Sequence, residues 1–255
     1  MVTGGVRGVG IGISRTFLRA GATVVACARR PGEQPVEVDG RAVEFLPCDV
    51  RDPEQVHSLV DRIVERHGQL DVLVNNAGGS PFALAADASP KFHSKIVELN
   101  LLAPLLVSQA ANAVMQKQDL GGAIVNISSV SGSRPSPGSA AYGAAKAGID
   151  SLTKSLAIEW APKVRVNAVV VGMVRTELAH LHYGDEAGIA AVGSTVPLGR
   201  MAEPEDVGNC AVFLASPLAA YVSGSTLTVD GGGERPAFLA AATASTTEES
   251  AEEKA

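Results

Sequence analysis

The stretch Thr3-Gly4-Gly5-Val6-Arg7-Gly8-Val9-Gly10 decides the fold class of this 255-residue chain. Glycines between a strand and a helix let the backbone turn sharply and let a pyrophosphate approach it closely. Free N–H groups at the start of the following helix then favour an anion. The spacing Gly-x3-Gly-x-Gly differs from the usual G-x-G-x-x-G, so a tight turn without a ligand is the alternative. We expect a dinucleotide-binding turn.

Beyond this turn, short β-branched runs alternate with helical patterns as far as about residue 230. The expected strands are 23–28, 42–46, 71–74, 123–127, 165–171 and 226–229. The expected helices are 11–20, 53–67, 92–116, 140–160 and 203–215. Continuous apolar strands are typical of parallel sheets buried on both faces, and repeated βαβ units wind in one hand. The pattern predicts an α/β protein with one doubly wound parallel sheet and helices on both faces.

No linker interrupts residues 1–233, so we expect one domain there, followed by a C-terminal extension at 234–255. Residues 240–255 are small, polar and acidic, which predicts disorder from about residue 240, with a frayed helix as the alternative. Only Met1 and Val2 precede the glycine turn, although strands typically have about 5–6 residues. Either the first strand is very short or the true start lies upstream, and we favour the second.

Composition excludes several classes of protein. The chain carries 21 Lys and Arg against 27 Asp and Glu, a net charge of −6, so we expect no nucleic-acid partner. Cys27, Cys48 and Cys210 are far apart, which indicates neither a disulfide framework nor a zinc site. The apolar run 166–174 is interrupted and short of the ~20 residues that span a bilayer. With no leader pattern visible, we expect a cytoplasmic protein without a membrane partner.

The second expected strand ends in Ala28-Arg29-Arg30, where a dinucleotide fold that prefers NAD carries an acid. Arg29, together with Arg7 of the glycine turn, can form charge-assisted hydrogen bonds to a 2′-phosphate. The alternative is that these arginines, Arg30 above all, are solvated. The pattern favours NADP(H), with NAD(H) possible.

Tyr142 and Lys146 are four residues apart on an expected helix, so they share one face. A nearby ammonium is expected to lower the tyrosine pKa and make the phenol usable in proton transfer. Ser128 or Ser129, at the end of the preceding strand, can bind the same substrate oxygen. An ordinary surface pair is the alternative for Tyr142 and Lys146, as a plain polar turn is for the Asn75-Asn76-Ala77-Gly78 segment.

Together these motifs resemble the short-chain dehydrogenase/reductase family over roughly residues 2–233. TGxxxGxG, NNAG and YxxxK stand at 3–10, 75–78 and 142–146. The resemblance implies a Rossmann-like fold and a catalytic set of Ser129, Tyr142, Lys146 and Asn100. It implies cofactor contacts from Gly4, Arg7, Gly8, Val9, Gly10, Arg29, Asp49, Val50, Asn76, Ala77, Gly78, Tyr142, Lys146, Gly172 and Thr176.

One departure from the family pattern lies after the sixth expected strand, where Val171 stands in place of the usual proline, although Gly172 and Thr176 are retained. The segment 177–195 corresponds to a substrate lid in the family. His180 and His182 lie in it without a third ligand at metal spacing, so no metal is expected.

The resemblance implies reversible hydride transfer between NADP(H) and a ketone or secondary alcohol. Apolar residues in the lid and after Gly78 favour a lipophilic substrate, either steroid-like or an acyl-CoA thioester from ring degradation. A 3-oxoacyl-thioester reductase, an isomerase or dehydratase using transient oxidation, and a catalytically idle cofactor-binding module are the alternatives. An apolar surplus on the helix 92–116 predicts a homo-oligomer, most simply a tetramer. Its members are Leu99, Leu102, Leu105, Leu106 and Val107.

Overall fold

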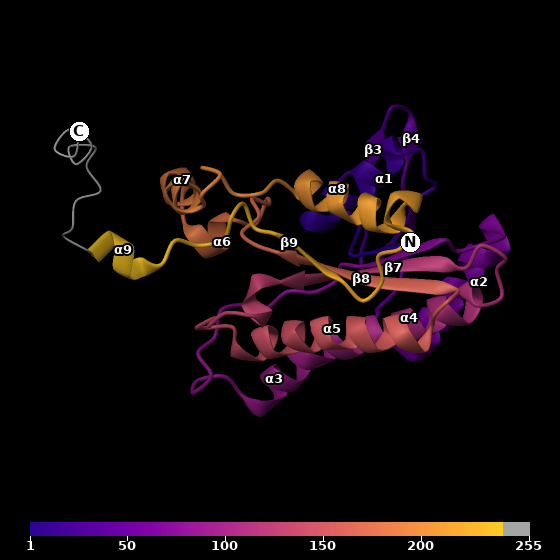
Figure 1. The fold of residues 1–255 in the computed structure, drawn as a ribbon, viewed down its shortest axis with the longest axis horizontal. Helices are drawn as coiled ribbons and strands as arrows, with labels where there is room; N and C mark the ends of the chain where they lie inside the picture. The colour runs from indigo at the N-terminus through magenta and orange to yellow at the C-terminus, as the bar shows by residue number, and fades with distance from the viewer. Residues whose placement is uncertain (242–255) are drawn as a thin grey trace, which may run out of the picture.

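A seven-stranded parallel sheet forms the centre of the molecule in the computed structural model, which describes residues 1–241 (Figure 1). Its spatial order is β5-β2-β1-β6-β7-β8-β9. The strands are β1 (Val2–Thr3), β2 (Val25–Ala28), β5 (Glu44–Pro47), β6 (Val72–Asn75), β7 (Gly122–Ser129), β8 (Val164–Val171) and β9 (Thr226–Val229). The doubly wound sheet predicted from the alternating pattern is confirmed.

Helices cover both faces of the sheet, as Figure 1 shows. One face is covered by α2 (Pro53–His67), α4 (Ala103–Met115) and α5 (Ala140–Glu159), and the other by α1 (Val9–Arg19) and α8 (Pro204–Ala215). Each layer has its own core. Val56 and Met115 lie in the first and Ile13 and Val207 in the second, and all four side chains are fully buried. The sheet is therefore buried on both sides, which explains its continuous apolar strands.

Helix starts follow their sequence signals. The carboxylate of Asp52 accepts hydrogen bonds from the backbone N–H groups of Glu54 and Gln55 ahead of α2, which begins at Pro53. A capping box of Glu203 and Asp206 begins α8. These caps satisfy backbone donors that a helix start otherwise leaves free.

One expected strand, 42–46, is divided in the structure. Its first residue lies in an antiparallel hairpin of β3 (Glu37–Val38) and β4 (Arg41–Ala42), whereas β5 begins at Glu44. Asp39 and Gly40 have φ values of 50° and 75°, which suit a two-residue hairpin turn. The β-branched pattern did not distinguish these two strands.

The expected helix 92–116 is a continuous helical stretch, Pro90–Met115, made of α3 (Pro90–Val97), a π-helical turn (Glu98–Leu102) and α4. By length and apolar composition it is the one described helix that could cross a membrane. Its inner residues, including Val107 and Met115, are buried in the core beside α2 and the sheet. It packs as a core helix in this fold.

The carboxyl ends of β1 and β6 mark the point where the chain reverses its direction across the sheet. β1 leads through α1 to β2 on one side, whereas β6 leads to β7 on the other. Ligands of open α/β sheets bind in the crevice at such a switch point. The lid region contains α6 (His180–Tyr183) and α7 (Glu186–Thr195), and α9 (Ala237–Ala241) follows β9. Most of the tail expected to be disordered, 242–255, lies outside the described residues.

Candidate active site

The glycine turn after β1 adopts a backbone that larger residues could not follow. Gly4 and Gly8 have φ values of 65° and 54°, in the left-handed region. A Cβ on Gly10 would lie 2.1 Å from the carbonyl oxygen of Gly4. The turn therefore leaves open backbone N–H groups at the start of α1, which is the arrangement that holds a pyrophosphate.

A carboxylate already occupies a donor of this turn. The backbone N–H of Gly8, the N-cap of α1, donates to Oε1 of Glu177 over 2.8 Å. The helix start thus binds an anionic oxygen in this structure, and the residues fit a pyrophosphate by the same chemistry. Sequence reasoning missed Glu177 as a contributor because it saw only a lid position.

The NNAG segment holds the glycine turn in place. The side-chain amide of Asn76 donates to the carbonyl oxygen of Thr3 over 2.9 Å. In return, Oγ1 of Thr3 accepts hydrogen bonds from the backbone N–H groups of Asn76 and Ala77, each at 3.0 Å. Asn75 is buried and donates to Asn126 and Ser108 at 2.9 and 2.8 Å. The segment is therefore an ordered brace between β1 and β6 and not a plain turn.

A cleft of about 530 Å³ opens at the switch point and gathers the residues of the predicted site. Its lining includes Gly4, Arg7, Gly8, Val9, Arg29, Asp49, Val50, Asn76, Ala77, Gly78, Ser129, Tyr142, Lys146, Gly172 and Thr176. Two predicted residues do not line it: Gly10 is buried within the turn, and Asn100 lies behind Gly78 and Gly79.

Lys146 is buried beneath Tyr142 on α5. Its ammonium lies 5.5 Å from the centroid of the Tyr142 ring and donates to the carbonyl oxygen of Ile127 over 2.7 Å. Burial lowers the Lys146 pKa to about 8, and the carboxylate of Asp150 opposes that shift. The pair shares one helix face, as its spacing predicts.

The pKa of Tyr142 differs from expectation. Burial raises the phenol pKa above its ordinary value, and hydrogen bonding to Ser129 opposes this effect. We expected the ammonium of Lys146 to lower it, but in this structure that charge is directed to the Ile127 carbonyl instead. Desolvation of the phenolate is therefore the larger influence on Tyr142 here.

Asn100 lies in the π-helical turn and connects that turn to the cleft. Its Oδ1 accepts from the backbone N–H of Gly79 at 2.8 Å, and its Nδ2 donates to the carbonyl oxygens of Gly79 and Ile96 at 3.0 and 2.9 Å. A Cβ on Gly78 would lie 2.7 Å from Asn100 Oδ1 and 3.6 Å from the Lys146 ammonium. Asn100 and the Lys146 ammonium therefore both lie close to Gly78, a proximity that their sequence positions alone do not indicate.

Several charged side chains lie at the end of the cleft beside β2 and β5. Arg7 and Arg29 are exposed and line it. Asp49 is held by a bidentate ion pair with Arg51, at 2.9 and 2.6 Å, and this pair lowers the carboxyl pKa. Arg51 was not predicted, because its pairing depends on the loop after β5. Arg30 lines a neighbouring cavity and not this cleft.

The lid contributes only part of the apolar surface expected of it. Leu178 lines the cleft and is exposed, as is Leu181 outside it. Ile189 is buried with Ala179 and Met201 in a small core of the lid itself. The residues of the lid segment 177–195 that line the cleft are Glu177, Leu178 and His182.

The fold, the glycine turn at its switch point and the paired Tyr142 and Lys146 define a dinucleotide-dependent oxidoreductase class. A family model described as "Enoyl-(Acyl carrier protein) reductase" matches residues 4–234. The chain belongs to the short-chain dehydrogenase/reductase family, whose enzymes act on CH–OH and C=O groups with NAD(P).

Relatives of different specificity match most of the chain. A 3alpha-hydroxysteroid dehydrogenase of Mediterraneibacter gnavus is 39% identical over 240 residues, covering 91% of this chain and 94% of that protein. An L-fucose dehydrogenase of Oryctolagus cuniculus is 37% identical over 241 residues, covering 92% and 84%. The ligand-free aldohexose dehydrogenase structure of Thermoplasma acidophilum has a TM-score of 0.85 at 32% identity, covering 97% and 96%.

Proposed function

We propose that this enzyme catalyses reversible hydride transfer between NADP(H) and a ketone or secondary alcohol on a lipophilic substrate. The observation that carries the proposal is the single cleft that brings Ser129, Tyr142 and Lys146 to the glycine turn. When bound, the nicotinamide cofactor supplies or accepts the hydride.

The chain's own residues perform the proton chemistry. In the reductive direction, the hydroxyls of Ser129 and Tyr142 hold the substrate oxygen, and the Tyr142 phenol donates the proton. Lys146 binds the nicotinamide ribose from its place beneath Tyr142, where its ammonium lies 5.5 Å from the centre of the phenol ring. Asn100 keeps Gly78 and Gly79 in place beside Lys146 and supports a water-linked proton relay to that lysine. Gly172 and Thr176 contact the nicotinamide end.

NADP(H) is the cofactor we propose in preference to NAD(H). Ala28 ends β2 without a carboxylate, and the exposed guanidinium groups of Arg7 and Arg29 line the same end of the cleft. The nearby acid, Asp49, is neutralised by Arg51. Within residues 1–241 neither guanidinium forms an ion pair with a carboxylate, so both are available to a 2′-phosphate. We assign Asp49 and Val50, which line the same cleft, to the adenine.

A steroid-like ketone, or an acyl-CoA thioester from ring degradation, is the substrate class we propose. The exposed side chain of Leu178, which lines the cleft from the lid, supports it. The similarity to a hydroxysteroid dehydrogenase agrees with this choice, whereas relatives acting on fucose and aldohexoses favour a sugar. A 3-oxoacyl-thioester reductase stays as the second candidate, because the description of the matching family model names an acyl-thioester substrate, although the enoyl reduction that it names is at a C=C bond.

We further propose a cytoplasmic homotetramer with a role in lipid metabolism. Leu102 of the π-helical turn and Ile158 of α5 are 54% and 82% exposed on neighbouring helices. Such apolar surface is typical of a covered face. Val107, which we had counted with this surface, is buried and contributes to the core instead.

A screen of steroid ketones, 3-oxoacyl thioesters and sugars with NADPH and NADH, and of the matching alcohols with the oxidised cofactors, tests the function. We expect NADPH-dependent reduction of a ring ketone. Turnover of sugars alone would overturn the substrate class. Binding of cofactor without turnover of any carbonyl or alcohol would favour the idle module, and isomerisation without net cofactor turnover would favour the isomerase.

A further inference from the structure

Two thiols lie close together at the end of the active-site cleft beside β2 and β5. Cys27 belongs to β2 and Cys48 directly follows β5, and both are free thiols, 0% and 2% exposed. Both line the cleft, so the cleft is the route by which a small solute reaches them. The fold therefore brings together two cysteines that are far apart in the sequence.

The sheet register puts both side chains on one face. Cys27 pairs with Leu46 in the parallel ladder of β2 and β5, and Cys48 is two residues beyond Leu46. Side chains two residues apart along a strand point to the same face, and all three belong to the core shared with α2. The ladder continues past β5, because the backbone N–H of Cys48 donates to the carbonyl oxygen of Ala28 over 3.0 Å. The two thiols are therefore diagonal neighbours on adjacent strands.

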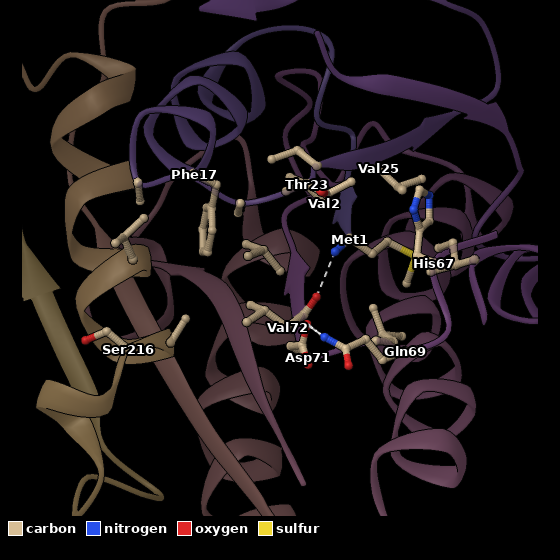
Figure 2. A pocket seen from close by; sticks show the side chains of 18 residues that line it. Met1, Val2, Phe17, Thr23, Val25, His67, Gln69, Asp71, Val72 and Ser216 are labelled. Atoms are coloured by element: carbon tan, nitrogen blue, oxygen red, sulfur yellow. Dashed lines mark hydrogen bonds between the residues drawn. The ribbon is translucent and has the colours of Figure 1, made fainter. Parts of the chain in front are cut away.

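The thiols belong to the nucleotide end of the molecule. A second cavity, of about 470 Å³, lies at the opposite, amino end of the sheet, and Figure 2 shows Val25 of β2 on its wall. Cys27 is two residues further along β2 and lines the cleft but not that cavity. Its carbonyl oxygen accepts from the backbone N–H of Gly4 over 2.7 Å, which connects it to the glycine turn. A chemical change at Cys27 or Cys48 therefore acts on the dinucleotide site.

The two thiols differ in acidity. Cys27 and Cys48 hydrogen bond to each other, and this bond lowers the pKa of Cys48, although burial and the carboxylates of Asp49 and Asp52 oppose the shift. The same bond, followed by burial, raises the pKa of Cys27. The thiolate is the form of cysteine that attacks a peroxide. Cys48 is therefore the attacking thiol, and Cys27 supplies the second thiol.

We propose that Cys27 and Cys48 are a peroxide-sensitive modification site, at which a disulfide between them closes the nucleotide end of the cleft. The sulfur of Cys48 attacks one oxygen of hydrogen peroxide, the O–O bond breaks, and Cys48 becomes a sulfenic acid while water leaves. The sulfur of Cys27 then attacks the sulfur of Cys48, the S–O bond breaks and a second water leaves with the remaining thiol proton. Two thiols are oxidised to one disulfide, and the peroxide is reduced to two waters.

Closing this disulfide has to move the loop after β5. With strands about 4.8 Å apart and a rise of about 3.3 Å per residue, diagonal neighbours have Cα atoms roughly 8 Å apart. A disulfide joins Cα atoms about 4.4–6.8 Å apart, so Cys48, beyond the end of its strand, is drawn toward Cys27. Asp49 and Val50 follow it in the chain and leave the positions that we assign to the adenine. Oxidation therefore weakens dinucleotide binding, and by reciprocity a bound dinucleotide opposes oxidation.

The test treats the reduced full-length enzyme with hydrogen peroxide and follows two separate quantities. Peptide mass spectrometry measures the Cys27–Cys48 crosslink, and fluorescence titration measures the Kd for NADPH and for NADH. We expect the crosslink to form and the Kd of the better-bound cofactor to rise about 10-fold or more, as loss of one charge-assisted hydrogen bond would give. Dithiothreitol is expected to reverse both changes, and saturating cofactor to slow the crosslink.

The inference rests on dinucleotide binding in this cleft and not on the proposed substrate or cofactor preference. Because both cofactors are titrated and no turnover is measured, a wrong preference or substrate leaves this test intact. Free thiols in the peroxide-treated parent would overturn the proposal, as would a crosslink that leaves the Kd of both cofactors unchanged. The crosslink is measured in the parent, so this part of the test does not depend on the folding of a variant.

Cysteine variants separate the pair from other oxidation. Each is compared with itself before and after peroxide, and we expect Cys48→Ala to keep its Kd. Cys210→Ala is the matched control, because Cys210 lies on α8 outside the cleft lining, and it is expected to lose affinity as the parent does. In Cys27→Ala, dimedone is expected to trap the sulfenic acid on Cys48. Loss of affinity that persists in Cys48→Ala would overturn the role of the thiol pair.

Discussion

The carboxylate of Glu177 is hydrogen bonded over 2.8 Å to the backbone N–H of Gly8, which is 169 residues away in sequence. The contact places a negative charge at the donor that the pyrophosphate of a dinucleotide requires. We therefore expect a bound dinucleotide to displace Glu177, which would connect cofactor binding with the position of the lid segment that begins at Glu177.

Replacing Glu177 is expected to tighten cofactor binding. Glu177→Ala removes a competing acceptor and a charge that repels phosphate, so we expect the Kd for NADPH to fall about 3- to 10-fold, in keeping with one exposed charge-assisted hydrogen bond. Fluorescence titration of NADPH measures this. Glu186→Ala is the control, because that lid carboxylate pairs with Arg175 and not with Gly8. An unchanged Kd in Glu177→Ala would refute the competition.

Tyr142→Phe tests the proton donor. Removal of the phenol hydroxyl is expected to lower kcat by about 10²- to 10⁴-fold, the usual contribution of a general acid, with NADPH binding retained. Lys146→Ala is expected to weaken both turnover and NADPH binding. Tyr221→Phe is the matched control, because Tyr221 is 105% exposed and remote from the cleft. A Tyr142→Phe rate within a few-fold of the parent would assign the proton to another group.

The pH profile reports on Lys146. Its pKa of about 8 means that the ammonium is lost as pH rises through that value, so kcat/KM is expected to decline above about pH 8. Asp150 raises that pKa, and Asp150→Asn is therefore expected to move the decline to lower pH. Asp61→Asn, on the exposed face of α2, is the control. A profile that is flat from pH 7 to 10 in the parent would contradict this assignment.

Arg29→Ala tests cofactor choice. We expect the KM for NADPH to rise on the order of 10-fold, with little change in the KM for NADH, because one charge-assisted bond to the 2′-phosphate is lost. Ala28→Asp combined with Arg29→Ala is expected to shift preference to NADH. Arg30→Ala is the control, since Arg30 does not line the cleft. Equal kcat/KM for both cofactors in the unmutated enzyme would refute the preference for NADP(H).

Light scattering tests the assembly. A tetramer of the 26.1 kDa chain is expected at micromolar concentration. Leu102→Glu places a charge in the proposed interface and is expected to shift the enzyme toward smaller species. Leu120→Glu is the control, because Leu120 is 96% exposed in the loop before β7. A monomeric parent would exclude the tetramer.

Much of the fold and cleft could be predicted, because local patterns carried them. The backbone of the turn after β1 has positive φ values that favour glycine, so its glycines are visible in the sequence. The four-residue spacing of Tyr142 and Lys146 likewise puts both on one helix face. Arg51 and Glu177 could not be predicted in the same way. Their contacts with Asp49 and Gly8 depend on the conformations of loops, and the hydrophobic periodicity of the sequence does not predict those conformations. The Tyr142 pKa also depends on how deeply the finished fold buries the phenol.

The π-helical turn Glu98–Leu102 limits the insertions and deletions that this part of the chain can tolerate. Within it Asn100 points inward to Gly79, while Leu102 is exposed on the outer side. Each residue advances an α-helix by about 100°, so deleting one codon here would restore a regular helix and turn Asn100 away from Gly79. Substitutions on the outer side of this turn therefore leave the Asn100 contact intact, whereas insertions and deletions within it are expected to be purged.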